Sequence, residues 1–166
     1  MNELEALATQ LGEALLTKGW RLATAESCTG GWVAQAVTAI AGSSNWFDRG
    51  FVSYSNEAKQ DMLGVRATTL AAHGAVSEAV VREMVAGALA RSRADFALAI
   101  SGIAGPAGGS AEKPVGTVWL AWGGRDGVCT AQRFHFEGDR AEVRRQSVVV
   151  ALQGVLLLLG GETRTA

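Results

Sequence analysis

The amino-acid sequence predicts an α/β protein: a single three-layer α/β/α domain in which helices cover both faces of a mixed sheet. Two observations predict it. Apolar residues alternate between helical spacing and short extended runs along most of the chain, and the last two extended runs flank a glycine-rich turn. A length of 166 residues is enough for one hydrophobic core. We therefore expect one domain over residues 1–166, without linker or internal repeat.

The N-terminal third predicts a helix, a strand and a second helix. Leucines and alanines recur at helical spacing over residues 1–18, and Gly19 is a plausible C-terminal stop. Residues 20–26 are short and extended in character. Helical spacing returns over residues 32–40, so a glycine-bearing turn must join this strand to this helix.

A second strand-to-helix junction follows. We expect a strand over residues 50–55, with Asn56 as the N-cap of a short helix over 57–63. This arrangement places Tyr54 and Lys59 on either side of the junction.

The next unit runs from helix to strand. Ser77 can cap a helix whose apolar face extends to Leu89, and residues 96–101 have the character of a buried strand. Residues 102–116 hold five glycines and both prolines, which predicts a loop with unusual backbone conformations.

The C-terminal part predicts an antiparallel pair and a long helix. Strands over 117–122 and 128–136 flank a glycine-rich turn. Asp139 and Glu142 have the spacing of a capping box and open a helix to about residue 159. We expect the tail over 160–166 to be frayed.

Composition limits the classes of partner. Hydrophobic residues make up 48% and charged residues 19%, which excludes general disorder. A net charge of -1 gives no global basis for binding nucleic acid or an anionic membrane, so we expect neither partner. The most apolar stretch, 147–159, is shorter than the roughly 20 residues of a membrane span.

The cysteines and the N-terminus indicate a cytoplasmic protein. Cys28 and Cys129 form no CxxC pair and have no histidine at metal-ligand spacing, so we expect a reducing compartment and no metal site. Glu3 and Glu5 stand where a secretory signal would carry basic residues.

The turn from Ser27 to Gly31 is the first candidate site. Backbone N–H groups and a helix dipole there favour a negative group or a developing oxyanion, which makes Ser27 a candidate nucleophile. The alternative is that Ser27 or Thr29 only caps the helix. Cys28 is a rival nucleophile, although adjacent residues point in different directions and a small buried packing role is an alternative for it.

A serine nucleophile needs a base. His73 and His135 stand beside no acid in an obvious triad arrangement, so Lys59 is the remaining candidate. Its pKa would have to be lowered by burial or by positive charge. Tyr54 could shuttle or orient the proton. The alternative is a surface lysine beside a half-buried aromatic ring.

The loop that opens with Ser101 and Gly102 is the second candidate site. It matches neither GxxxxGK[ST] nor GxGxxG, so it is not a nucleotide P-loop. It could present backbone donors and the Ser101 hydroxyl to a ligand, or serve only as a structural crossover.

Arg140 stands in the first turn of the last helix, where a cation opposes the helix dipole and needs an anionic partner. A ligand phosphate, or Glu137 or Asp139, could supply it. We expect Arg144 and Arg145 to be solvated.

Several long segments together resemble the CinA C-terminal domain family, and within it the stand-alone nicotinamide-nucleotide amidases. These segments are ESCTGGW, AGSSNWFDRGFVSYSNEAK, HGAVSE, SGIAGPAGGSAEKPVGTVW and GDRAEVRRQ. The resemblance implies hydrolysis of the carboxamide of nicotinamide mononucleotide to nicotinate mononucleotide and ammonia in pyridine nucleotide recycling, without a metal or other cofactor. The alternative is a non-catalytic nucleotide-sensing or interaction module.

The resemblance also implies residue roles: Ser27 as nucleophile, Lys59 as general base and Tyr54 as an assisting residue. It places these residues at the substrate: Cys28, Thr29, Gly30, Gly31, Asn56, Ser101, Gly102 and Arg140.

Two further expectations concern substrate range and domain composition. Ala107 stands at a loop position where relatives often carry an acid, which bears on substrate preference. We expect no molybdopterin-binding-like N-terminal domain, and hence no pyrophosphatase activity linked to it.

A homodimer is possible. Its interface could use some of the five tryptophans, although these residues could equally belong to the core: Trp20, Trp32, Trp46, Trp119 and Trp122.

Overall fold

The structure of the protein, a computed structural model, describes residues 2–160. The tail expected to be frayed therefore lies, beyond Gly160, outside the described residues. Helices and strands follow one another along the described chain in this order: α1 (Glu3–Lys18), β1 (Leu22–Glu26), α2 (Trp32–Thr38), β2 (Phe47–Val52), α3 (Asn56–Leu63), α4 (Ala67–His73), α5 (Glu78–Ala90), β3 (Phe96–Gly102), β4 (Thr117–Gly124), β5 (Cys129–His135) and α6 (Arg140–Leu158).

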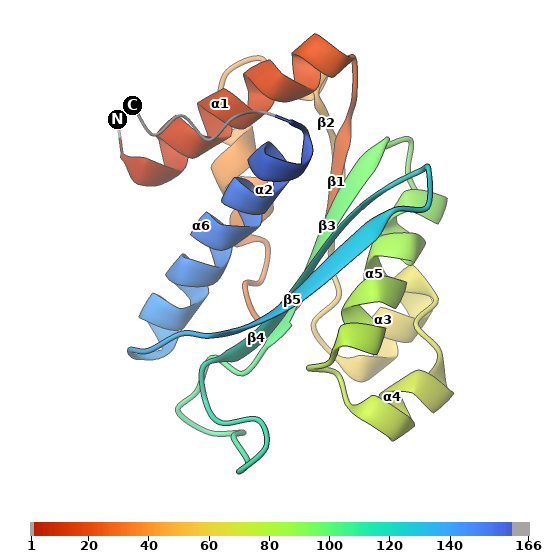
Figure 1. Ribbon diagram of the computed structural model, residues 1–166, viewed down its shortest axis with the longest axis vertical. Coiled ribbons are helices and arrows are strands. Elements are labelled where there is room, and N and C mark those ends of the chain that lie inside the picture. The colour runs from red at the N-terminus through yellow and green to blue at the C-terminus, as the bar shows by residue number, and fades with distance from the viewer. Residues whose placement is uncertain (1, 161–166) are drawn as a thin grey trace.

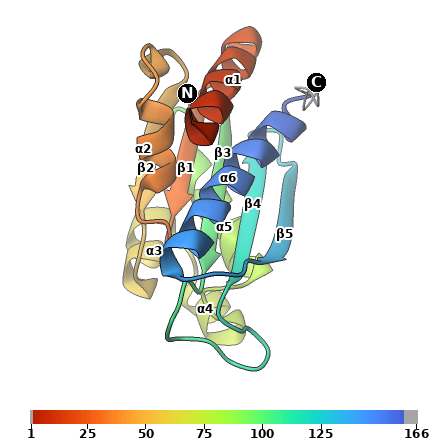
Figure 2. The same ribbon diagram turned by 90° about the vertical axis from the view of Figure 1, so that its left-hand side faces the viewer.

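The strands form one mixed sheet between two layers of helices, which confirms the predicted three-layer architecture. The strand order is β2-β1-β3-β4-β5, with β1 parallel to β2 and β3 and with β4 and β5 antiparallel to their neighbours. Helices α1, α2 and α6 cover one face, and α3, α4 and α5 lie on the other (Figures 1 and 2). Within residues 2–160, no helix is long and apolar enough to cross a membrane.

Successive side chains of β1 point to opposite faces of the sheet, and each face has its own hydrophobic core. Leu22 packs in the core beneath α1, α2 and α6, whereas Ala23 and Ala25 pack in the core beneath α5. The alanines let α5 approach the sheet closely, because small side chains leave little volume between helix and strand.

The second junction differs from the prediction by a few residues. Strand β2 begins at Phe47 rather than at residue 50, because its backbone pairs with β1 from Leu22 onward despite its charged side chains. The N-cap of α3 is Ser55, not Asn56: the Ser55 hydroxyl accepts the amide of Ala58 at 2.9 Å. Asn56 is therefore the first helical residue.

Helix α4 was not predicted. Its sequence ATTLAAH is short and contains few large apolar residues, so no helical stripe stands out. Glu83 of α5 holds its start, because the Glu83 carboxylate accepts both the amide of Arg66 and the hydroxyl of Thr69. Tertiary contacts thus stabilise a helix that the local sequence pattern does not predict.

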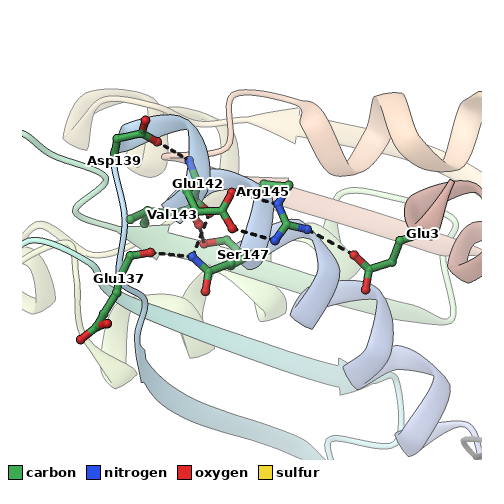
Figure 3. Close-up of polar contacts among 8 residues, drawn as sticks. Glu3, Glu137, Asp139, Glu142, Val143, Arg145 and Ser147 are labelled. Carbon is green, nitrogen blue, oxygen red and sulfur yellow. Dashed lines mark hydrogen bonds and ion pairs between the residues drawn. The ribbon is translucent and has the colours of Figure 1, made fainter.

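Both predicted caps elsewhere are present. The Ser77 hydroxyl accepts the amide of Val80 at the start of α5, and Asp139 accepts the amide of Glu142 at the start of α6. The capping box of α6 is only half formed, since the Glu142 carboxylate bonds to Arg145 (Figure 3).

Candidate active site

The candidate site lies at the carboxyl ends of the parallel strands β1 and β3. From here the chain leaves β1 toward α2 and β2, and leaves β3 in the opposite direction toward β4. Such a switch point is the place where open α/β sheets bind ligands. The Ser27 amide donates to the Ile100 carbonyl at 3.0 Å, which places Ser27 next to Ser101 across the strand pair. The loop that follows β3 projects beyond this edge (Figure 1).

Strand alternation separates Ser27 from its two neighbours. Glu26 and Cys28 point toward α2 and α6, whereas Ser27 points to the opposite face, toward α3. Cys28 is 5% exposed, and burial raises the pKa of its thiol to about 11. A buried thiol with that pKa is protonated at neutral pH, so Cys28 fits the packing role and not that of a nucleophile.

Ser27 and Lys59 contact one another directly. Lys59 Nζ lies 3.0 Å from Ser27 Oγ and donates to the carbonyl of Tyr54 at 2.9 Å. The lysine is 1% exposed and forms no ion pair with any described acidic residue. Burial lowers the pKa of Lys59, and the nearby Cys28 opposes this only in part. The 3.0 Å contact and the lowered pKa together make Lys59 a candidate base for Ser27.

Tyr54 contributes its backbone to this pair and its side chain to the edge of the site. Its carbonyl is within hydrogen-bond distance of both Ser27 Oγ and Lys59 Nζ, at 3.2 and 2.9 Å. Its ring is 58% exposed, and its hydroxyl accepts from Arg140 at 3.2 Å. In this structure the phenol is thus bonded to Arg140, and the carbonyl orients the lysine.

Arg140 links the two candidate loops. Its guanidinium donates to the Gly105 carbonyl at 2.9 Å and to the Tyr54 hydroxyl. It forms no ion pair with Glu137 or Asp139, the two surface partners considered from the sequence. The side chain is exposed, so it remains accessible to an anionic ligand.

Glu26 was missed by sequence reasoning. Its buried carboxylate accepts the Thr29 hydroxyl at 2.6 Å and the amides of Val33 and Ala34 at 2.9 and 3.1 Å. The carboxylate thereby accepts two backbone amides at the start of α2 that have no acceptor within the helix. The N-cap residue, Gly31, has no side chain that could do this. The sequence held one signal for this role: Glu26 is an acidic residue at the end of an apolar strand. A buried acid needs polar partners.

Two consequences follow for the turn. Neither Ser27 nor Thr29 caps α2 with its side chain, because Glu26 serves that end of the helix. The Thr29 hydroxyl is bonded to Glu26, so only the backbone of Thr29 is available to a substrate.

Arg144 was expected to be solvated, and that expectation is wrong. Its guanidinium donates to the carbonyls of Cys28 at 3.0 Å and Thr29 at 3.2 Å, and it lies over the ring of Trp32 with 5.6 Å to the centroid. The spacing of residues in α6 could not reveal this, because the partners are more than a hundred residues away in the chain.

The remaining predicted residues divide into two groups. Ser101 is 1% exposed beside the turn, and a Cβ on Gly102 would lie 2.6 Å from a Val118 methyl group. Asn56 lies exposed on the first turn of α3, where its carbonyl accepts from Gln60, and it forms no hydrogen bond with the other described candidates.

Neither histidine forms a hydrogen bond with Ser27 in the described chain. His73 ends α4, and His135 contacts the Val115 carbonyl at 3.1 Å. Among residues 2–160, no three His, Cys, Asp or Glu side chains group as metal ligands would.

Comparison with known proteins places the chain in a family. The model of the CinA C-terminal domain matches residues 4–159. The chain belongs to the CinA C-terminal domain family. It is 61% identical over 152 residues, 92% of either chain, to a protein of Escherichia coli strain K12 named nicotinamide-nucleotide amidohydrolase PncC. A protein of the same name from Pseudomonas putida is 53% identical over 95% of this chain and 98% of its own length.

The fold of solved family members is the same. The crystal structure of the competence/damage inducible protein CihA from Agrobacterium tumefaciens superposes with a TM-score of 0.92 at 48% identity, covering 96% of this chain and 97% of that one. The sequence-based assignment to the family, and with it the mixed-sheet fold, is therefore confirmed.

Proposed function

We propose that this CinA-family protein is an amidohydrolase that converts nicotinamide mononucleotide into nicotinate mononucleotide and ammonia. The observation that carries the proposal is the 3.0 Å contact between Ser27 Oγ and a buried Lys59 without an acidic partner among residues 2–160. Relatives that match nearly the whole chain at 53–61% identity are named nicotinamide-nucleotide amidohydrolases, which supports the same activity here.

The mechanism starts with proton transfer from Ser27 to the neutral amine of Lys59. The serine oxygen attacks the carboxamide carbon, and backbone amides of the turn stabilise the oxyanion. Lys59 then donates the proton to the leaving nitrogen, so ammonia departs and a nicotinoyl ester of Ser27 remains. Lys59 then takes a proton from a water molecule that attacks this ester, and passes it to the Ser27 oxygen as the ester C–O bond breaks. The acid is released as its carboxylate, and the serine hydroxyl and the neutral lysine are restored.

Other residues would hold the nucleotide. Arg140 is exposed and joins the Gly105 loop to Tyr54, so it can bind the substrate phosphate. Ser101 and Gly102 border the turn from the adjacent strand end and would contact the carboxamide. A cytoplasmic location and a homodimer stay predictions. Two of the five tryptophans, Trp46 and Trp122, are buried, and the other three are half-buried.

The decisive experiment measures ammonia release and identifies nicotinate mononucleotide by mass spectrometry, with purified protein, nicotinamide mononucleotide and a chelator. Ser27→Ala is expected to lower kcat by at least about 1000-fold. Cys28→Ala is the matched control, because the neighbouring side chain is buried on the other face, and it should retain activity. Near-normal turnover by Ser27→Ala would refute the mechanism. A folded but inactive wild-type protein would favour a non-catalytic nucleotide-binding module.

A further inference from the structure

Two of the five backbone amides in the turn from Ser27 to Gly31 are already hydrogen-bonded. The amide of Ser27 donates to the Ile100 carbonyl, and that of Gly30 donates to the Ser27 carbonyl. Within the described chain, the amides left without an acceptor in this turn belong to Cys28, Thr29 and Gly31. The start of α2 offers no substitute, because the Glu26 carboxylate already occupies the amides of Val33 and Ala34.

The direction of a free amide is set by the carbonyl in the same peptide group. In a trans peptide the carbonyl of one residue and the N–H of the next point in opposite directions. The Cys28 carbonyl is bonded to Arg144 Nε at 3.0 Å. The Thr29 N–H therefore points away from α6 for as long as Arg144 holds that carbonyl.

Arg144 is itself held in place. Its guanidinium lies over the Trp32 ring, and a second nitrogen donates to the Thr29 carbonyl at 3.2 Å. A Cβ on Gly30 would come within 3.5 Å of the same nitrogen. From the other side, the buried carboxylate of Glu26 holds the Thr29 hydroxyl. The turn is thus clamped between Arg144 and Glu26.

We propose that Arg144 is a positioning residue that orients the Cys28–Thr29 peptide so that the Thr29 amide can stabilise the oxyanion formed at Ser27. This inference rests on the proposed function, since it needs Ser27 to be the nucleophile. Arg144 touches no reacting atom and acts through the backbone it holds. Its loss should lower the rate of the chemical step and leave substrate affinity nearly unchanged.

The chain offers a matched control in the next residue. Arg145 is also on α6, but its guanidinium binds Glu142 and reaches Glu3 of α1, away from the turn (Figure 3). Arg144→Gln and Arg145→Gln therefore remove the same charge from the same helix, and only the first releases the two carbonyls.

The test measures kcat and KM for nicotinamide mononucleotide and the rate at which a fluorophosphonate labels Ser27. Arg144→Gln should lower kcat about 10- to 100-fold with KM within about threefold, and slow the labelling similarly. Arg145→Gln should stay within about twofold of wild type in both assays. The midpoint of the pH profile should not move, because the pKa of Lys59 is lowered by its own burial and not by the charge of Arg144.

The labelling stoichiometry separates positioning from misfolding. Misfolding lowers the fraction of protein that can be labelled, whereas lost positioning lowers the rate per labelled site. If Arg144→Gln does not fold, Arg144→Lys carries the test: it keeps the charge but lacks the fork that bridges two carbonyls, and its kcat should fall at least about fivefold below that of Arg145→Lys.

Each outcome supports or overturns one of the two ideas. The positioning role is overturned if Arg144→Gln has the same kcat and labelling rate as Arg145→Gln, or if it raises KM while kcat stays constant. If wild-type protein is labelled in an Arg144-dependent way but does not hydrolyse nicotinamide mononucleotide, the proposed function fails and the positioning role stands. If it is neither labelled nor active, both fail.

Discussion

At the scale of single residues, the site depends on which charges the fold removes from water. Lys59 is buried to 1% exposure, has two oxygen partners and forms no ion pair with a described carboxylate, so its protonated form lacks a direct counter-ion. Glu26, equally buried, is instead fully hydrogen-bonded by a hydroxyl and two amides. Hydrogen bonds thus offset the cost of burial at Glu26, whereas at Lys59 burial disfavours the protonated amine and lowers its pKa.

The pH dependence of activity should report the pKa of Lys59. Burial lowers this pKa, and the neutral amine is the active form, so kcat/KM should rise with pH and level off below the usual lysine pKa of about 10.4. Steady-state kinetics between pH 5 and 10 would measure the midpoint. Lys59→Met should remove the activity at every pH, and Lys59→Arg should do the same, since arginine keeps its proton. A midpoint at or above that of free lysine would contradict the role of base.

At the scale of elements, the packing of α3 against α5 decides where Lys59 lies. A Cβ on Gly87 of α5 would collide with the Leu63 carbonyl at the end of α3. The glycine therefore permits a helix contact that alanine would not, and Lys59 is one helical turn from that contact.

Gly87→Ala should thus affect both stability and catalysis. Alanine is the better helix former, but overpacking should outweigh this and lower the free energy of unfolding by about 2 kcal/mol. Movement of α3 should also lower kcat at least about 10-fold. Gly12→Ala is the control: its Cβ would lie 2.7 Å from the Trp46 ring, so it should destabilise the fold and leave kcat within about threefold. Urea unfolding and steady-state kinetics on both variants would test this prediction. Equal losses of kcat in the two variants would contradict the claim that the α3–α5 contact positions Lys59.

The elements also show how far sequence reasoning reaches. Ser27, Lys59 and Arg140 could be singled out because strand ends and helix starts are local features, and the structure brings the first two into contact. Glu26 and Arg144 could not, because their roles depend on the face that β1 turns toward α2 and on α6 lying against a turn more than a hundred residues earlier. Local patterns thus reveal which residues sit at strand ends, whereas the partners across layers follow only from the assembled sheet.

At the scale of the whole molecule, Asp48 joins segments that are distant in the chain. Its carboxylate on β2 accepts the amide of Arg93, just before β3, and the guanidinium of Arg49, and it lies 3.9 Å from that of Arg21 before β1. These contacts connect the amino ends of the three parallel strands, and the candidate site lies at their carboxyl ends. They should stabilise the frame without taking part in the chemistry.

This arrangement predicts a loss of stability in acid. Burial by itself would raise the pKa of Asp48, but the Arg93 amide and the Arg49 guanidinium outweigh it, so the pKa is lowered. A carboxyl with a lowered pKa in the folded state stabilises the protein above its unfolded pKa of about 3.9, and this contribution is lost as pH falls through the folded pKa. Asp48→Asn should therefore cost on the order of 1 kcal/mol at pH 7 and nearly nothing at the lowest pH at which the protein still folds.

Urea unfolding at pH 7, 5 and 3 would test this, with Glu13→Gln on the exposed side of α1 as the control, since Glu13 has no ion-pair partner among residues 2–160. The gap in unfolding free energy between wild type and Asp48→Asn should close as the pH falls, whereas Glu13→Gln should follow wild type throughout. Because asparagine can still accept the Arg93 amide, a gap that stays constant with pH would show that the hydrogen-bond geometry, and not the charge of Asp48, stabilises this edge of the sheet.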